Sequence, residues 1–286
     1  MNTSYMSNWF KGRKLVIATK HEKEKVMEPL LKDALEVDCL INTAFDTDTL
    51  GTFTGETTRK DDPLTTARKK CLAVMDHLQC DLGIANEGSF GPHPSLLFVP
   101  ADDEIVILID RKNNLEITAR EISTATNFNG KNISHWDELK SFADEIGFPS
   151  HGLIIKKDEK DHVDIRKGIN DWQELEKLFH EFQSRYGSFF AETDMRAMYN
   201  PSRMKVIEQA TIKLIEKINS VCPACNAPGF SVTSAKEGLP CSACSAPTRS
   251  IISHNYTCQK CSYSLEKRYP YDKHAEDPMY CDFCNP

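Results

Sequence analysis

The cysteines near the end of this chain restrict its possible folds more than any other feature. Of the 11 cysteines, eight lie after Val221 and form four Cys-x-x-Cys pairs: Cys222/Cys225, Cys241/Cys244, Cys258/Cys261 and Cys281/Cys284. A Cys-x-x-Cys turn places two thiolates on the same side of the backbone, as half of a tetrahedral metal site requires. Four such pairs therefore predict two closed four-cysteine sites, each holding one structural zinc ion.

The way in which the four pairs combine stays open from spacing alone. The gaps between successive pairs are 15, 13 and 19 residues, and each is long enough for a β-hairpin. We favour a combination of neighbours, in which the first pair joins the second and the third joins the fourth; nested and alternating combinations remain open. A redox-active dithiol or a disulfide framework is the competing interpretation, but in a reducing compartment such repeats indicate metal more often.

The stretch around these cysteines, residues 219–286, has too few large apolar residues for a core of its own. Metal binding would then supply folding free energy, on the order of 10 kcal/mol per site. A closed site of four cysteines has no open position, so catalytic zinc is not expected. The stretch holds six basic and six acidic residues, and eight thiolates with two Zn²⁺ bring its charge to −4. This balance disfavours nucleic acid and favours a protein partner.

Composition places the whole chain among ordinary globular proteins. It has 286 residues, a formal net charge of −7 and 40% hydrophobic residues. No stretch approaches the roughly 18 consecutive apolar residues of a membrane helix, and residues 1–14 lack the apolar segment of a secretory signal. We therefore expect a cytoplasmic protein with no membrane partner, and the acidic balance argues against one that coats DNA.

The rest of the sequence predicts an α/β (or α+β) domain with a mixed sheet over residues 14–200. Its strongest strand is Glu104–Asp110, whose continuous apolar run indicates burial on both faces. Asn113 and Asn114 predict a turn into an antiparallel neighbour. We expect a connecting helix over residues 201–218, followed by a small ribbon-like domain with two four-cysteine zinc sites over residues 219–286.

Thr19 is the last residue of a predicted strand, residues 14–19, and His21 lies between this strand and a predicted helix. Backbone N–H groups at a helix N-terminus attract anions, so both side chains are candidates for contact with a phosphate. The alternative is a solvated run of charges, and for this segment taken alone it is the better-supported interpretation.

Carboxylates and basic residues are mixed in a second segment, between residues 46 and 70. Glu56 and Asp62 are candidate ligands of Mg²⁺, a cation that prefers oxygen. The basic residues are candidates for binding a phosphate: Arg59, Arg68 and Lys70. The alternative is an acidic loop in which Asp62 stabilises the start of the helix that Pro63 begins.

Glu87, Ser89 and His93 lie on a segment rich in glycine and proline, after the predicted strand of residues 81–86. Open α/β sheets bind ligands beyond the ends of their strands. We therefore assign Glu87 and His93 to the candidate catalytic residues, with Ser89 as a binding residue. The alternative is a packed turn with a structural carboxylate.

Several segments resemble an uncharacterised bacterial family whose members join an α/β domain to a tail with four Cys-x-x-Cys pairs. They cover nearly the whole chain from Leu15: Thr52–Glu56, Ala67–Cys71, Leu82–Pro94, Gly238–Cys241 and Cys281–Pro286. The resemblance implies the fold but no activity, because none is assigned to that family.

Residues 14–120 are also similar to the inosine/xanthosine triphosphate pyrophosphatase superfamily, in these segments: Ile17–His21, Thr52–Phe53, Ala67–Lys69 and Glu87–Gly88. The similarity implies that Glu87, with Asp62 or Glu56, holds Mg²⁺. It further implies contacts to a triphosphate from these residues: Thr19, His21, Arg68 and Lys70. The sequence departs from that pattern at two positions, since His21 replaces an asparagine and Glu24 replaces a lysine.

Two hypotheses follow. In the first, the chain is a Mg²⁺-dependent hydrolase of nucleotides or related phosphate esters, in which Glu87 binds metal or deprotonates water. In the second, it is a non-enzymatic adaptor that binds a small ligand through its α/β domain and docks a protein partner through its zinc ribbon.

Overall fold

The computed structural model describes residues 7–41, 61–160 and 163–286. These residues form two compact units, an N-terminal unit (Ser7–Ile215) and a C-terminal unit (Glu216–Pro286). The predicted fold class is confirmed: the N-terminal unit combines helices with a mixed sheet, and the C-terminal unit carries the two groups of cysteines. Along the described part of the chain, no helix has the length and apolar character needed to cross a membrane.

The first sheet of the N-terminal unit has five strands in the order β2-β1-β3-β4-β5. The strands are β1 (Lys14–Ala18), β2 (Asp38–Ile41), β3 (Leu82–Pro92), β4 (Pro100–Asp110) and β5 (Leu115–Ser123). Strand β1 runs parallel to β2 and β3, whereas β3, β4 and β5 form an antiparallel meander. The predicted turn at Asn113 and Asn114 joins β4 to β5, and Asn114 has a positive φ of 55°.

The helices of this region are α1 (Ser7–Phe10), α2 (Glu24–Leu35), α3 (Pro63–His77) and α6 (Pro201–Asn219). Side chains alternate between the two faces of a strand, so the ion pairs show which helix covers which face. Glu87 and Glu116 point to the face covered by α3, where Lys70 and Arg68 pair with them.

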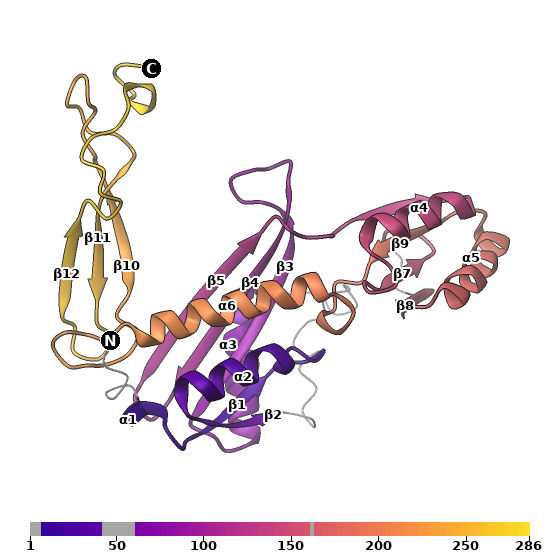
Figure 1. Ribbon diagram of the computed structural model, residues 1–286, viewed down its shortest axis with the longest axis horizontal. Helices are drawn as coiled ribbons and strands as arrows, with labels where there is room; N and C mark the ends of the chain where they lie inside the picture. Colours follow the sequence, from indigo (N-terminus) through magenta and orange to yellow (C-terminus); the bar gives the residue numbers. More distant parts are fainter. Residues whose placement is uncertain (1–6, 42–60, 161–162) are drawn as a thin grey trace. The chain divides into compact units, whose positions relative to one another are not determined.

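The opposite face of the sheet is covered by α6, which lies along it in Figure 1. Glu104 of β4 and Glu121 of β5 are cross-strand partners and therefore share this face. Arg203 and Lys213 of α6 form ion pairs with them. The two faces thus carry separate sets of charged contacts.

A second sheet, not anticipated as separate, follows in the same unit. Its order is β6-β9-β7-β8, with β6 (Gly130–Ile133), β7 (Leu153–Lys156), β8 (Ile165–Ile169) and β9 (Phe189–Thr193). Helices α4 (Trp136–Ile146) and α5 (Trp172–Tyr186) pack on one face of it. Phe142, Phe182 and Phe189 are fully buried in the core between them. A short 3-10 helix, η2 (Ala197–Tyr199), leads to α6.

One local prediction is wrong in a way that affects the candidate site. Residues 87–92 do not form a loop after a strand, because β3 continues through them to Pro92 and pairs with β4 along its whole length. Glycine and proline suggested a turn, but the long β4 strand lies beside these residues and pairs with each of them. Glu87 therefore lies within a strand.

The C-terminal unit is a three-stranded antiparallel sheet in the order β10-β11-β12. Its strands are β10 (Val232–Glu237), β11 (Ile251–Thr257) and β12 (Ser264–Arg268), and a 3-10 helix, η3 (Pro278–Tyr280), precedes the last cysteines. Every residue of β10 and β12 is exposed. The sheet itself therefore provides almost no hydrophobic core.

Candidate metal centres and a buried polar network

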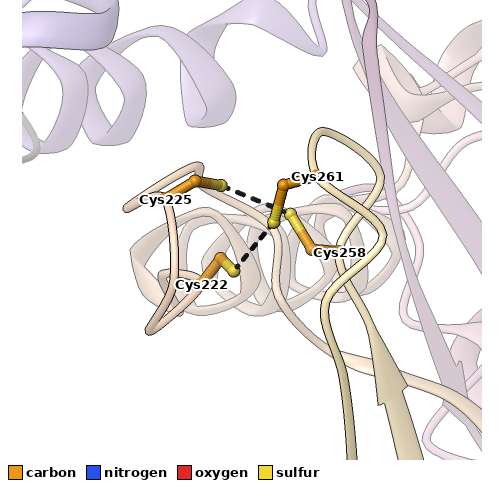
Figure 2. Close-up of side chains that lie close together, drawn as sticks. All are labelled: Cys222, Cys225, Cys258 and Cys261. Atoms are coloured by element: carbon orange, nitrogen blue, oxygen red, sulfur yellow. Dashed lines mark hydrogen bonds between the residues drawn. The ribbon is translucent and has the colours of Figure 1, made fainter.

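The eight cysteines of the C-terminal unit form two tetrads. One consists of Cys222, Cys225, Cys258 and Cys261, and the other of Cys241, Cys244, Cys281 and Cys284. Within each tetrad the four sulfur atoms lie within 4.8 Å of one another. Figure 2 shows the first tetrad, whose side chains converge from two separate turns on a common centre.

This arrangement corrects the combination of pairs that we favoured from spacing. The first pair joins the third, and the second joins the fourth. The reason lies in the antiparallel sheet, because each strand carries the chain from one end of the unit to the other. Strand β10 separates the first pair from the second, β11 returns the chain to the first end, and β12 leads away again. Pairs one strand apart therefore lie at opposite ends of the sheet.

The Cys-x-x-Cys turns repeat one backbone geometry. In the first three turns the residue after the second cysteine has a positive φ near 60°: Asn226, Ser245 and Ser262. Its N–H donates to the carbonyl oxygen of the first cysteine, at 2.8 to 3.0 Å. In the fourth turn Asn285 makes the same hydrogen bond to Cys281, at 2.9 Å. This closed loop holds two sulfur atoms on one side of each turn.

The sulfur spacing fits a tetrahedral zinc ion. The Sγ atoms of Cys222 and Cys261 are 3.7 Å apart, and those of Cys225 and Cys258 are 3.6 Å apart. The corresponding distances in the second tetrad are 3.8 and 3.6 Å. A Zn–S bond of about 2.3 Å in a tetrahedron requires sulfur atoms about 3.8 Å apart. The donor set and its spacing therefore match a structural zinc site with four cysteine ligands at both ends of the sheet.

A second group of polar residues is buried in the N-terminal unit, on the face of the five-stranded sheet that α6 covers. At its centre, Arg203 Nε donates to Glu104 Oε1 at 2.7 Å, and both side chains are at most 4% exposed. Asn86 Nδ2 donates to the other oxygen, Glu104 Oε2, at 2.8 Å. Lys23 Nζ donates to Asn86 Oδ1, also at 2.8 Å. The chain of contacts connects α6, β4, β3 and the start of α2.

Gly88 leaves room for the side chains of Glu104 and Arg203 to lie against the sheet. A Cβ atom at this position would lie 2.3 Å from Glu104 Oε1 and 2.5 Å from Arg203 Nη2. Both are closer than a methyl group tolerates, so the ion pair occupies the space that a side chain would need. We refer to Lys23, Asn86, Asp102, Glu104 and Arg203 as the buried network.

Burial shifts the pKa values of this network. Loss of solvent raises the pKa of Asp102 to about 8, and the neighbouring Glu104 carboxylate contributes in the same direction while Arg203 opposes. Loss of solvent lowers the pKa of Lys23 to about 8, assisted by the charge of Arg203. Burial alone would also raise the pKa of Glu104, but Arg203 and Lys23 outweigh it and lower that pKa.

The network lies where the parallel part of the sheet ends. Pairing between β1 and β3 stops at Ala18 and Ala85, and Asn86 follows directly. Because the chain leaves β1 toward β2 and returns on its other side to β3, this is the position where the strand order reverses. Open α/β sheets bind ligands at such a point. Here Thr19 is 5% exposed, and among the residues described its Oγ1 atom has no hydrogen-bonding partner.

The carboxylates of Glu87 and Asp62 both have partners close by in the structure. Glu87 is 3% exposed, and its Oε2 atom accepts from Lys70 Nζ at 2.7 Å, so two predicted site residues meet in a buried ion pair. Asp62 is the N-cap of α3, and its carboxylate accepts from Thr65 N at 3.0 Å and from Thr65 Oγ1 at 2.6 Å. These hydrogen bonds lower the pKa of Asp62.

The remaining predicted residues are spread over several elements. Arg68 binds Glu116, and Ser89 lies half-buried on β3. His93 Nδ1 accepts from two backbone N–H groups of the turn that follows β3, those of Ser95 and Leu96, at 3.1 Å. His21 precedes α2 with a φ of 64°. Glu56 and Arg59 lie outside the described residues, so their part in a Mg²⁺ site stays a prediction.

Sequence reasoning missed the buried network. The sequence places Asn86 and Glu104 in predicted strands, Lys23 in a run of charges before a predicted helix, and Arg203 in the connecting helix, and it assigns none of them to a site. One signal could have found part of it: Asp102 and Glu104 alternate at the start of the most apolar strand and so share one face. Burial of that face implies partners for both carboxylates.

The fold and its sites define an α/β protein with an appended double-cysteine-tetrad unit. Residues 70–286 match the model of a domain of unknown function, DUF6671, and the chain belongs to that family. Among curated proteins, no match was found. Among solved structures, the crystal structure of protein VC0702 from Vibrio cholerae matches with a TM-score of 0.36 and 8% identity, over 73% of this chain and 96% of that one. We draw nothing about function from a likeness at this level. The similarity to the inosine/xanthosine triphosphate pyrophosphatase superfamily stays a prediction.

Proposed function

We propose that the C-terminal unit binds two structural zinc ions, one in each tetrad. The observation that carries this proposal is the spacing of the sulfur atoms: two pairs in each tetrad lie 3.6 to 3.8 Å apart, and all four sulfur atoms lie within 4.8 Å of one another. The test is elemental analysis of the purified chain. Two equivalents of zinc are expected, falling to one in Cys222→Ser/Cys258→Ser and in Cys241→Ser/Cys281→Ser. Fewer than one equivalent in the unaltered chain would contradict the proposal.

We further propose that the N-terminal unit binds and hydrolyses a nucleotide or a related phosphate ester at the end of β1. The proposal rests on the buried Thr19 hydroxyl, which has no partner among the described residues, at the point where the strand order reverses. The ammonium group of Lys23 contacts Asn86 beside this point and would bind a phosphate there. In this proposal Glu87 binds Mg²⁺ or takes a proton from water, and Asp62 or Glu56 completes the metal site.

A nucleotide panel with Mg²⁺ tests the hydrolase proposal through release of phosphate or pyrophosphate. Turnover should be lost in Glu87→Gln. Glu116→Gln is the matched control, because Glu116 also pairs with a basic residue of α3 on the same face of the sheet. No turnover above background with any nucleotide, or equal turnover in the two variants, would remove the proposal.

A second candidate function is that of an adaptor. Large apolar side chains are exposed close in sequence to the last cysteine pair: Tyr271, Met279, Tyr280 and Phe283. Exposed apolar residues of this kind are typical of protein interfaces. Removal of residues 219–286 separates the two candidates, since partner capture should be lost while hydrolysis persists.

A further inference from the structure

A pocket of about 430 Å³ lies within the N-terminal unit, between the turn that joins β3 to β4 and the second sheet. Its position differs from that of the buried network and of the proposed phosphate site. It is lined by the end of β3 and the start of β4, by residues 128–130 before and at the start of β6, and by side chains of β9. Its size falls in the range of small-molecule sites, about 300–1,000 Å³.

Three phenyl rings contribute to the lining: Phe98, Phe128 and Phe190. Phe98 is fully exposed, and Phe128 is 37% exposed, so a ligand would cover apolar surface that now faces water. The ring of Phe128 packs against that of Phe90, with centroids 5.8 Å apart, which fixes its orientation. Phe190 is 9% exposed and contributes a buried part of the lining, but the ammonium group of Lys156 already lies 5.4 Å from its ring centroid. The rings that a ligand cation would contact are therefore those of Phe98 and Phe128.

The charged residues in the lining are two glutamates, Glu159 and Glu192. Glu192 forms an ion pair with the buried Lys156, whose Nζ lies 2.9 Å from the carboxylate, so its charge is compensated. Glu159 is exposed in the turn after β7 and leaves the lining with a net charge of −1. No lysine or arginine is part of the described lining.

We propose that this pocket binds a small organic monocation with an apolar body, such as an aryl- or alkylammonium compound. Phenyl faces attract a cation with about 0.5–1 kcal/mol at exposed sites and more when it is desolvated. Among the lining residues that the structure describes, Glu159 is the carboxylate without an ion pair, and it suits one positive charge and repels anions, so nucleotides and phosphate esters do not fit here. The site is independent of the proposed hydrolase activity.

The experiment titrates benzyltrimethylammonium chloride into the full-length chain and follows binding by calorimetry or by NMR shifts. Two comparison ligands carry the same ring: benzyl alcohol is neutral, and benzoate is anionic. We expect the cation to bind about tenfold more tightly than benzyl alcohol, a difference of about 1.4 kcal/mol, and benzoate to bind more weakly than both.

Two variants with matched controls locate the site. Glu159→Gln should weaken binding of the cation about fivefold to tenfold, while Asp158→Asn, which removes the adjacent carboxylate outside the lining, should not. Phe98→Ala should weaken it about threefold to fivefold, while Leu96→Ala in the same turn should not. Phe98, Glu159 and both control positions are exposed, so all four variants should fold.

Three outcomes would overturn the proposal. Equal affinity for benzyl alcohol would show simple apolar adsorption. Equal loss in Asp158→Asn and Glu159→Gln would show attraction to the general surface charge. Absence of any binding of benzyltrimethylammonium would show that the pocket does not take a monocation.

Discussion

The N-terminal and C-terminal units of this protein differ in what stabilises their folds. The N-terminal unit buries large apolar side chains on both sheets, such as Met75 and Ile107 on the first and Phe182 on the second. In the C-terminal unit the buried large apolar side chains are few, and one cysteine of each Cys-x-x-Cys pair is buried beside them: Cys222, Cys241, Cys258 and Cys281. With so few buried apolar side chains, this small unit gains little stability from burial of apolar surface. Under the proposal that each tetrad binds zinc, metal takes the stabilising role of a hydrophobic core in the C-terminal unit.

The units also differ in how they use buried polar groups. In the C-terminal unit they converge on two centres that can each hold an ion. In the N-terminal unit the buried Glu104 is matched by Arg203 and Asn86, whereas Asp102 Oδ1 has no hydrogen-bonding partner among the described residues. Loss of metal should therefore unfold the C-terminal unit. Loss of one ionic partner should lower the stability of the N-terminal unit.

The largest expected effect is that of metal removal. A chelator such as EDTA should unfold the C-terminal unit, because each structural zinc contributes on the order of 10 kcal/mol. The N-terminal unit should keep its structure, because its described cores consist of packed apolar side chains. Amide NMR spectra recorded before and after chelation measure this effect. The signals of residues 220–286 should lose their chemical-shift dispersion, while those of the first sheet should persist. Cys39→Ser, which lies outside both tetrads, is the control and should respond to the chelator as the unaltered chain does.

Loss of the central ion pair should have the next largest effect. Arg203→Met leaves Glu104 buried without its charged partner, which costs about 3–5 kcal/mol. Arg120→Met removes a solvent-exposed partner of Asp103 and should cost about 0–1 kcal/mol. Denaturant unfolding of the N-terminal unit measures both values. Similar losses in the two variants would contradict the role assigned to the buried network.

A methyl group at position 88 tests the close packing of the network. Gly88→Ala should destabilise the N-terminal unit by about 1–3 kcal/mol, because the new Cβ overlaps Glu104 and Arg203. Gly91→Ala is the matched control on the same strand, since nothing lies within 4 Å of a Cβ there. Thermal unfolding of the two variants should separate them clearly.

The smallest effect concerns pH. The pKa of Asp102 is raised to about 8 in the folded state, above its unfolded value, so the folded state holds a proton that the unfolded state has lost. Stability should therefore fall as pH rises from about 4 toward 8, by about 1 kcal/mol between pH 7 and pH 8 from this group. Lys23, whose pKa is lowered to about 8, acts in the opposite direction above pH 8.

Unfolding curves of Asp102→Asn at pH 7 and pH 8 test this effect. The variant should lose the fall in stability that Asp102 produces over this interval. Asp103→Asn, on the opposite face of β4, should retain it. An unchanged pH dependence in Asp102→Asn would show that Asp102 does not titrate in this range.

Much of the fold could be predicted because the signals are local. The apolar run in β4, the two asparagines before β5 and the Asp62-Pro63 start of α3 each lie within a few residues of the element they specify. The extension of β3 through Glu87 could not be predicted, because its partner is the distant start of β4. The glycines and prolines there predict a turn, although the antiparallel pairing accommodates them.

By itself, the sequence determined that eight cysteines form turns suited to metal binding, because the Cys-x-x-Cys spacing closes a loop within a few residues. Only the tertiary structure decided which turns share a centre, because the strands between them alternate in direction and bring together pairs that are not adjacent in sequence. It likewise decided that Lys23, Asn86, Glu104 and Arg203 meet. Contacts between residues as far apart as 104 and 203 depend on how the sheet and α6 pack, and no local pattern records that.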